Sequence, residues 1–378
     1  MSLDFAQRPM LVFWETTRAC ALKCRHCRAS AVPRPLPDEL NRAEGRHLVR
    51  QVAGFGSPHP ILVLTGGDCL ARPDIFELAK LATRLGVHPA MSPSVTPNLD
   101  PAAFGRMREA GVRAVSISLD GALAATHERV RGITGHFEAT LEAIRAAVAA
   151  GHRVQVNTTV MRENLEELPE LAALLRELGA HIWEVFFLVV TGRAARKSQL
   201  RPAEGEEVCH LLYDASGYGF AVRTVEAPFF RRVTSWRRSR GDLQPEEVSE
   251  VFGLGDFYER SVRRLQALLG PPSHTPAAHT LATRDGSGII FIAHNGDVYP
   301  AGFLPLPLGN VREHPLAELY REHELLRAIR RGDFTGRCGG CEYRELCGGS
   351  RSRAFASGGD PLGEDPACSF RPVARKAS

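Results

Sequence analysis

Three cysteines, Cys20, Cys24 and Cys27, lie within the eight-residue stretch CALKCRHC. Thiolates are soft ligands that bind zinc and iron–sulfur clusters, and a structural zinc ion takes four closed ligands. The Cys-x3-Cys-x2-Cys spacing supplies three thiolates and no fourth nearby. A [4Fe–4S] cube held by three cysteines keeps one iron open, and that iron can chelate the amine and carboxylate of an amino acid. The motif therefore predicts an iron–sulfur centre with one open coordination position.

A second group of cysteines lies near the C-terminal end, in CGGCEYRELC and one more distant position. Its members are Cys338, Cys341, Cys347 and Cys368. Four thiolates can close the coordination of either a zinc ion or an iron–sulfur cluster, so both remain open. Clustering of seven cysteines in two groups favours metal or cluster ligation over disulfides. The two other cysteines, Cys69 and Cys209, are expected to be buried packing residues.

The composition of the 378-residue chain is that of an ordinary globular protein, with 44% hydrophobic and 24% charged residues and a formal net charge of +4. No apolar run approaches the roughly 20 residues that a membrane helix needs. The N-terminus has no basic stretch followed by an apolar core, so a secretion signal is not expected. These features predict a cytoplasmic protein with no membrane partner.

Residues 10–225 alternate short β-rich runs with amphipathic helical stretches, and this pattern indicates the fold that positions the cysteine loop. The β-like runs are LVFWETT, ILVLTGGD, VHPAMSPSVT, VRAVSISLD, RVQVNTTVM and HIWEVFFLVV. Several helical stretches end in glycine, which readily adopts the left-handed conformation that follows a helix. Six such units predict an α/β fold, a partial (βα)6 TIM-like barrel whose functional residues gather at the carboxyl ends of the strands. CALKCRHC follows the first strand at that end.

The pattern changes near residue 240. We expect a barrel domain over residues 1–240, and a linker with a small C-terminal cysteine-rich domain over residues 241–378. In the second part, GSGIIFIAHNGDVYPAG predicts a β-hairpin with its turn at Asn295 and Gly296. PLAELYREHELLRAIRRG predicts one helix, and the second cysteine group follows it in a glycine-rich loop.

A Cys-x3-Cys-x-aromatic-Cys loop after the first strand of such a barrel resembles the radical S-adenosylmethionine (AdoMet) superfamily. The resemblance implies a [4Fe–4S] cluster on the three N-terminal cysteines, AdoMet on its open iron, and His26 near the adenine. It also implies AdoMet contacts from residues that end the second, fourth and fifth strands, namely Gly66, Gly67, Asp68, Ser118, Asp120 and Asn157. In the superfamily, AdoMet is cleaved reductively to a 5′-deoxyadenosyl radical, with electrons from a donor such as flavodoxin or ferredoxin.

The C-terminal cysteine group resembles the SPASM extension of peptide-modifying radical enzymes. A full SPASM region carries seven cysteines for two auxiliary clusters. Three of those positions here hold Ala301, His314 and Arg351, and all three belong to the same auxiliary cluster. The resemblance therefore implies one auxiliary [4Fe–4S] cluster on the four C-terminal cysteines, and two clusters in the whole protein.

The stretches WETTRACALKCRHCRA and EAPFFRRV resemble the radical enzymes of the alternative haem and haem d1 pathways, which remodel propionate side chains of iron porphyrinoids. This resemblance implies that Arg231 and Arg232, near the barrel mouth, pair with propionates. Two other substrates remain open. One is a ribosomally made peptide, although the chain shows no peptide-recognition segment before its first strand; the other is a small metabolite, including an acceptor of a 3-amino-3-carboxypropyl group.

A non-enzyme alternative is a zinc-stabilised module that binds nucleic acid. A basic stretch with interleaved aromatic residues, from Phe229 to Arg240, would supply the binding surface. This alternative explains four C-terminal cysteines. It does not explain a three-cysteine loop at the first strand of a barrel, so we expect an enzyme with a small-molecule or peptide substrate rather than a nucleic-acid partner.

Overall fold

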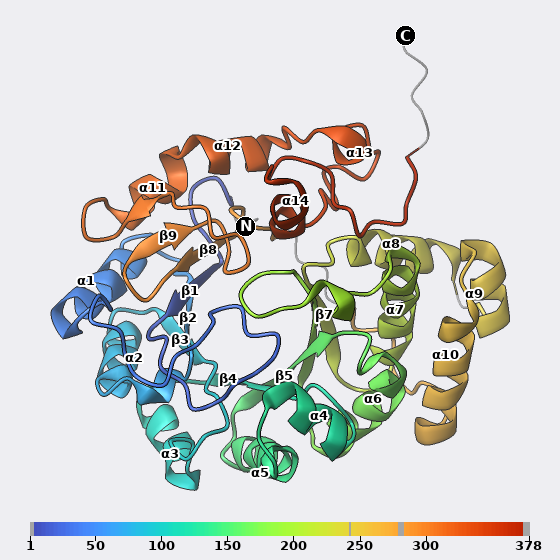
Figure 1. Cartoon of the computed structure of the whole chain (residues 1–378), viewed down its shortest axis with the longest axis horizontal. Coiled ribbons are helices and arrows are strands. Elements are labelled where there is room, and N and C mark those ends of the chain that lie inside the picture. The colour runs from blue at the N-terminus through green and yellow to red at the C-terminus, as the bar shows by residue number, and fades with distance from the viewer. Residues whose placement is uncertain (1–3, 242, 279–282, 373–378) are drawn as a thin grey trace.

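A computed structural model describes residues 4–241, 243–278 and 283–372, and Figure 1 shows its ribbon. The framework is a ten-stranded sheet with the order β10-β9-β8-β1-β2-β3-β4-β5-β6-β7. The seven strands that pair in parallel from β1 onward are β1 (Leu11–Glu15), β2 (Ile61–Thr65), β3 (His88–Met91), β4 (Ala114–Ser118), β5 (Arg153–Val160), β6 (Ile182–Phe187) and β7 (Ala221–Val225). The predicted partial barrel is confirmed, and β7 adds one strand to the six that we predicted.

Helices cover the outer face of this sheet (Figure 1). The first is α1 (Arg42–Ala53), which begins at a capping box between Asn41 and Glu44. The barrel helices that follow are α2 (Ile75–Arg84), α3 (Pro101–Glu109), α4 (Ala124–Arg131), α5 (His136–Ala149), α6 (Leu168–Glu177) and α7 (Pro202–Ala215). Next come α8 (Phe230–Arg240), α9 (Pro245–Phe252) and α10 (Asp256–Leu269); α8 packs on α7, and α10 packs on α6 and α7.

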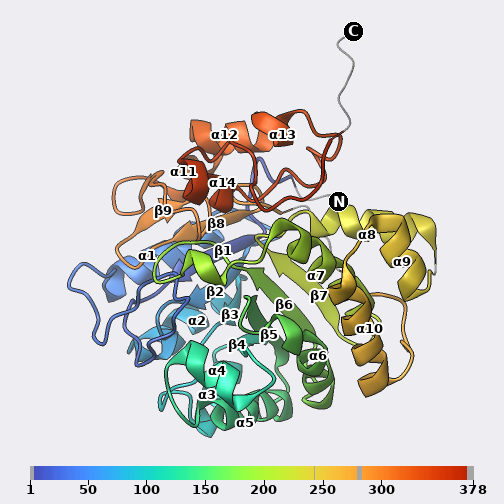
Figure 2. The ribbon, with the colours of Figure 1, turned by 45° about the vertical axis from the view of Figure 1, so that its right-hand side comes forward.

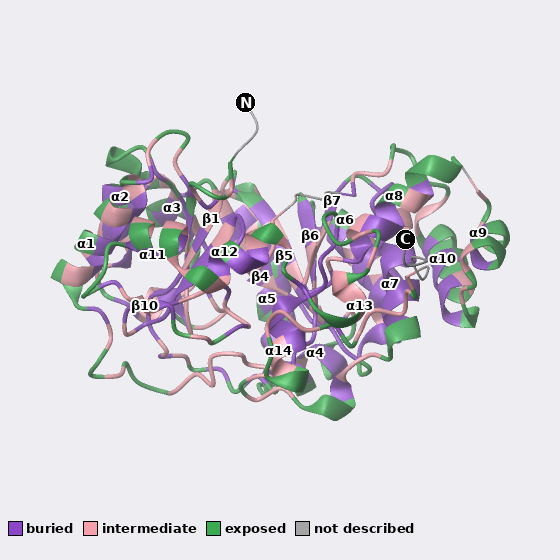
Figure 3. Cartoon of the chain, turned by 90° about the horizontal axis from the view of Figure 1, so that it is seen from above, coloured by how far each residue is buried: buried purple, intermediate pink, exposed green. Residues whose placement is uncertain are grey.

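Buried and partly exposed residues alternate along the parallel strands, because successive side chains of a strand point to opposite faces of the sheet. In β5, Val154 and Val156 are buried in the core, whereas Gln155, Asn157 and Thr159 are partly exposed. Helix α5 packs on β4 and β5, and α7 packs on β7; in Figure 3 the exposed residues lie mainly on the outer sides of the helices. The partly exposed residues therefore line the inner face of the barrel.

The C-terminal region continues the same sheet. Strand β8 (Ile289–Ile292) pairs in parallel with β1 on the side opposite β2. β8 and β9 (Asp297–Tyr299) form the predicted hairpin, with Gly296 at φ +89° in the turn, and β10 (Gly309–Asn310) pairs with β9. The cysteine-rich region is thus attached to the barrel through backbone hydrogen bonds to its first strand.

The single helix predicted over PLAELYREHELLRAIRRG is two helices, α11 (Leu316–Glu322) and α12 (Glu324–Arg331). His323 separates them: its backbone is extended, and its side chain caps α12 by accepting a hydrogen bond from Leu325 N. Helices α13 (Gly336–Gly339) and α14 (Arg351–Gly358) follow, and Figure 2 shows α11–α14 together on one side of the barrel. Within the described ranges, no helix has both the length and the apolar character needed to cross a bilayer.

Candidate active site

The three N-terminal cysteines lie in the loop between β1 and α1, at the carboxyl end of the parallel sheet. Cys24 is buried, and Cys20 and Cys27 are partly exposed. Leu22 N donates to Cys20 Sγ at 3.4 Å. The hydroxyl of Ser94 lies 3.7 Å from the same sulfur and donates to Gly67 O at 2.8 Å, so it links the cysteine loop to the loop after β2. Ser94 was not among the predicted site residues. It follows the four-residue strand β3, whose end the sequence pattern did not locate.

Gly66 and Gly67 allow the loop after β2 to approach the cysteine loop. A Cβ atom at Gly67 would lie 2.4 Å from Ala19 O, and one at Gly66 would lie 2.6 Å from Thr17 O. Gly66 also has a φ of +157°, close to the limit of what L-residues adopt. The close approach places the glycine pair directly beside the cysteine loop, as the motif predicts.

Asp68 is buried, and its carboxylate is fully used within the protein. It accepts hydrogen bonds from Thr96 Oγ1 at 2.7 Å, Asn98 Nδ2 at 3.0 Å and Leu70 N at 3.1 Å. Its side chain therefore fixes the loops after β2 and β3, and its backbone N–H donates to Ala19 O at 2.7 Å, which ties the loop after β2 to the cysteine loop. The neighbouring Cys69 is fully buried, and burial raises the pKa of its thiol, which agrees with the expected packing role.

Asp120 connects β4 to the cysteine loop. Arg131 Nη2 lies 2.6 Å from Asp120 Oδ2, and Arg131 Nη1 lies 3.6 Å from Cys24 Sγ. His26 Nε2 lies 3.5 Å from the same carboxylate oxygen. Burial acts to raise the pKa of Asp120, but the charges of Arg131 and His26 outweigh it and lower the pKa. An ionised Asp120 therefore holds the buried guanidinium of Arg131 against Cys24, a predicted cluster ligand. The sequence gives no sign that this arginine of α4 contacts the cysteine loop.

Two buried histidines are connected to the backbone of Asp120 by hydrogen bonds. Asp120 N donates to His127 Nδ1 at 3.1 Å, and His127 Nε2 lies 2.7 Å from His136 Nδ1. His136 Nε2 in turn lies 3.1 Å from Val95 O. One assignment satisfies the chain: each ring accepts at Nδ1 and donates at Nε2, so both rings are neutral. Burial lowers the pKa of His127 to about 3 and also lowers the pKa of His136.

This neutral histidine pair predicts a loss of stability in mild acid. Both histidines take up protons in the unfolded chain below a pKa near 6.5, whereas in the folded protein their pKa values are lower. Their contribution is therefore complete above pH 6.5 and declines as the pH falls, for His127 down to about pH 3. Between pH 7.5 and 5.5 we expect the free energy of unfolding to fall by about 1 kcal/mol because of His127, with a further loss from His136, measured by anaerobic urea denaturation. A His127→Gln, His136→Gln double variant should lose this pH dependence; an equal dependence in that variant contradicts the assignment.

Ser118 and Asn157 lie side by side on the inner face of the barrel. Ser118 is the last residue of β4, and Asn157 is its register partner in β5. Because β5 continues to Val160, Asn157 lies within the strand and not at its end, which corrects the predicted boundary. Gln155 Nε2 donates to Asn157 Oδ1 at 2.8 Å and to Glu184 Oε2 at 2.7 Å.

The four C-terminal cysteines line a common cavity. Backbone amides donate to three of the sulfurs, each at 3.4 Å: Tyr343 N to Cys341, Gly349 N to Cys347 and Asp365 N to Cys338. Amide–sulfur hydrogen bonds of this kind stabilise the thiolates of iron–sulfur clusters. Among the described residues, no three His, Cys, Asp or Glu side chains lie close enough together to share one metal ion. The four thiols line one cavity, and the predicted auxiliary cluster would be held there.

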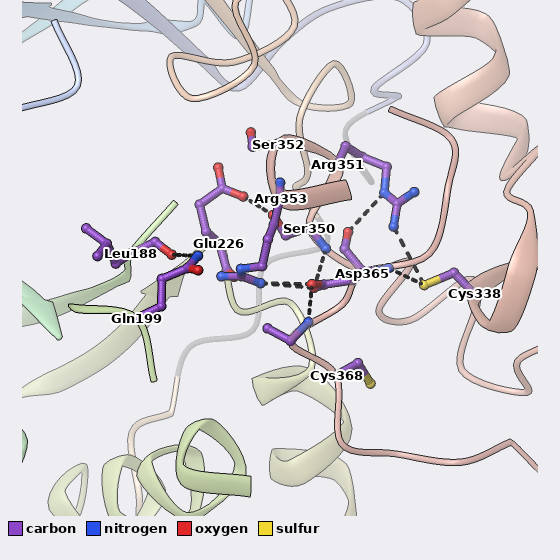
Figure 4. Close-up of polar contacts among 12 residues, drawn as sticks. Leu188, Gln199, Glu226, Cys338, Ser350, Arg351, Ser352, Arg353, Asp365 and Cys368 are labelled. Atoms are coloured by element: carbon purple, nitrogen blue, oxygen red, sulfur yellow. Dashed lines mark hydrogen bonds and ion pairs between the residues drawn. The ribbon is translucent and has the colours of Figure 1, made fainter. Parts of the chain in front are cut away.

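Two buried arginines of α14 contact residues that line this cavity (Figure 4). Arg351, which stands where a full SPASM region has cysteine, is 0% exposed; its Nη2 lies 3.7 Å from Cys338 Sγ. Arg353 Nη1 lies 3.0 Å from Asp365 Oδ1, and its Nη2 donates to Glu226 O at 2.6 Å. Arg353 therefore connects the end of β7 with the loop that carries the cysteines.

Arg231 and Arg232 both make hydrogen bonds within the protein. Arg232 donates from both terminal nitrogens to Glu206 at 2.7 Å and is 2% exposed. Arg231 donates to the backbone carbonyls of Leu346 and Thr283. The two arginines therefore hold α7, α8 and the C-terminal region together, and the predicted pairing with propionates would compete with these contacts.

Replacing Arg232 with alanine is therefore expected to lower stability. The change leaves the buried Glu206 carboxylate without its guanidinium partner, with the Ser369 hydroxyl still donating to it at 2.9 Å, and should cost about 3 kcal/mol in the free energy of unfolding. Anaerobic chemical denaturation measures this loss. Arg240→Ala, an exposed arginine at the end of the same helix, is the matched control and should change stability by less than about 0.5 kcal/mol. Equal stability of the two variants would contradict the structural role of Arg232.

Comparison with known families agrees with this geometry. Residues 14–175 match the model of the Radical SAM superfamily, and residues 284–342 match that of the SPASM iron–sulfur cluster-binding domain. The structure of Streptococcus suis SuiB bound to S-adenosylmethionine superposes with a TM-score of 0.69, at 14% identity, over 96% of this chain and 78% of SuiB. Native anSMEcpe with bound AdoMet gives a TM-score of 0.65, at 16% identity, over 95% and 93% of the two chains. These likenesses show the fold.

Sequence relatives narrow the family further. The AdoMet-dependent heme synthase of Methanosarcina barkeri is 36% identical over 96% of this chain and 97% of its own length. That of Nitratidesulfovibrio vulgaris is 37% identical over 96% and 92%. The pre-heme d1 synthase of Dinoroseobacter shibae is 31% identical over 95% and 85%. The chain is therefore a radical AdoMet enzyme with iron–sulfur clusters and a SPASM-type C-terminal domain, and it belongs to the family that includes the AdoMet-dependent haem synthases.

Proposed function

We propose that this enzyme converts propionate side chains of an iron porphyrin to vinyl groups, as a haem-forming enzyme would. The observation that carries the proposal is similarity over nearly the whole chain to AdoMet-dependent heme synthases, at 36–37% identity. Relatives named PqqA peptide cyclase are 26% identical over a similar length. The higher identity favours a porphyrin over a peptide.

We assign the catalytic cluster to Cys20, Cys24 and Cys27, and the auxiliary cluster to the four C-terminal cysteines. AdoMet contacts are assigned to the predicted set His26, Gly66, Gly67, Asp68, Ser118, Asp120 and Asn157. Their convergence at the carboxyl end of the sheet supports this assignment. When bound, these groups supply reductive cleavage of AdoMet to a 5′-deoxyadenosyl radical that takes hydrogen from the substrate, and a second centre for electron transfer.

The protein's own residues position the cysteine loop. Asp120 and Arg131 hold Cys24, and Ser94 links Cys20 to the glycine pair. Conversion of a propionate to a vinyl group removes one hydrogen atom, one electron and carbon dioxide from the side chain. The reaction therefore needs both a hydrogen-abstracting site and a route for the electron, which two separate cysteine sets can provide.

We divide the chain into a barrel (residues 1–240), which would hold the catalytic cluster, and a cysteine-rich part (residues 241–378), which would hold the auxiliary cluster. Strand β8 of the second part pairs with β1 of the first. We place the enzyme in the cytoplasm, with flavodoxin or ferredoxin as the electron donor. Seven thiols grouped for cluster ligation need a reducing compartment. Such a compartment also supplies low-potential electron carriers.

The proposal is tested by anaerobic incubation with AdoMet, dithionite and iron coproporphyrin III, which carries four propionates. We expect 5′-deoxyadenosine together with porphyrin products that have lost the elements of formic acid, once for each vinyl group formed, by mass spectrometry. If 5′-deoxyadenosine forms and the porphyrin stays intact, the substrate assignment is wrong. Methylthioadenosine in its place would instead support aminocarboxypropyl transfer.

A further inference from the structure

Four polar residues form one continuous row across the inner face of the barrel. Ser118 in β4 pairs in register with Asn157 in β5, Asn157 pairs with Glu184 in β6, and Glu184 pairs with Arg223 in β7. Register partners in a parallel sheet project from the same face, and neighbouring strands lie about 4.8 Å apart. Arg223 therefore lies two strands from Asn157, one of the residues that we assign to AdoMet.

Arg223 has no hydrogen-bond partner for its Nε among the residues that the structure describes, although that atom is buried. Its guanidinium acts on Glu184 only through its charge, since the Glu184 carboxylate accepts its hydrogen bond from Gln155. Burial raises the pKa of Glu184, and the charge of Arg223 opposes this shift. A guanidinium is always charged and carries five donors, and a buried donor without a partner is costly, so this position favours a second anion beside Arg223.

Aromatic residues lie on the same face of the sheet as this arginine. Phe186 is two residues beyond Glu184 on the same face of β6, and its ring lies 6.2 Å from that of Phe303 in the C-terminal region. Both rings are partly exposed. The inner face thus combines a guanidinium whose buried Nε has no partner among the described residues with flat apolar surfaces, which suits an aromatic ligand that carries a carboxylate.

We propose that Arg223 binds a carboxylate of the substrate inside the barrel, beside the AdoMet site. This inference rests on the proposed function, and it names the subsite that holds the porphyrin. Arg223 takes the role that the sequence suggested for Arg231 and Arg232, whose guanidinium groups are occupied by protein partners. The planar fork of the guanidinium matches a carboxylate with two parallel hydrogen bonds.

The test measures binding of iron coproporphyrin III to the anaerobic, cluster-loaded protein by titration of the Soret absorbance. Arg223→Gln should raise the Kd by about 10- to 100-fold, the range expected for loss of charge-assisted hydrogen bonds. Arg223→Lys keeps the positive charge but not the planar guanidinium. Its Kd should lie between those of the unchanged protein and Arg223→Gln. Arg153→Gln, an exposed arginine at the amino end of β5, is the matched control and should bind as the unchanged protein does.

A second probe separates carboxylate recognition from a general loss of structure. The unchanged protein should bind the tetramethyl ester of the porphyrin more weakly than the acid, and Arg223→Gln should lose this preference. Glu184→Gln removes the neighbouring negative charge and should tighten binding of the acid. Iron content and far-UV circular dichroism report whether each variant is folded.

The outcomes distinguish the two levels of the proposal. If the unchanged protein binds and modifies the porphyrin, and Arg223→Gln binds it equally well or keeps the acid-over-ester preference, the subsite is wrong and the proposed function stands. If the unchanged protein neither binds nor modifies the porphyrin, the proposed function fails, and the subsite falls with it.

Discussion

Replacing Cys24 with alanine is expected to abolish AdoMet cleavage and to leave about half of the iron in the protein. Cys24 is the buried member of the three-cysteine loop, and Arg131 contacts its sulfur. Two remaining thiols cannot hold the cube, whereas the four C-terminal thiols form a separate set around their own cavity. Iron and sulfide analysis of anaerobically prepared protein, with chromatographic assay of 5′-deoxyadenosine, measures both effects.

The matched control is Cys69→Ala, which removes a fully buried thiol from the neighbouring loop. It should retain all of the iron and the ability to cleave AdoMet. Cleavage that survives in the Cys24 variant would show that the catalytic cluster is held elsewhere. Loss of all iron would show that the two cysteine sets do not bind their clusters independently.

Cys341→Ala is expected to remove the other half of the iron and to destabilise the C-terminal region. Cys341 lies in a loop next to the short helix α13, where the apolar core is small, and its sulfur receives the amide hydrogen bond of Tyr343. The cluster that it helps to bind therefore contributes much of the local stability. Iron analysis and limited proteolysis measure the two effects, and cleavage should begin within residues 333–372.

Cys209→Ala is the control for this variant, because Cys209 is fully buried in α7 and belongs to neither predicted ligand set. It should keep the full iron content. Unchanged iron in Cys341→Ala would contradict an auxiliary iron–sulfur cluster on this loop, and zinc in the unchanged protein would identify the ion that replaces it.

The features that depend on local sequence could be predicted. The alternation of β-rich and helical stretches predicted the barrel, and Asn295 with Gly296 predicted the hairpin turn, because periodicity and turn preferences act over a few residues. The seven cysteines predicted two ligand groups because most members of each group are close together in the sequence. The helix over PLAELYREHELLRAIRRG was wrong in detail, since nothing in its periodicity shows that His323 leaves the helix and caps the next one.

What the sequence alone determined is the order of the elements and the identity of the candidate ligands. The tertiary structure decided which charged side chains are already paired. Arg232 lies beside Glu206 and Arg131 beside Cys24, although 26 and 107 residues separate them, whereas Arg223 projects into the barrel without a described partner for its Nε. Nothing in the local sequence of these arginines shows which of them has a protein partner, because the pairing of distant strands and helices determines it.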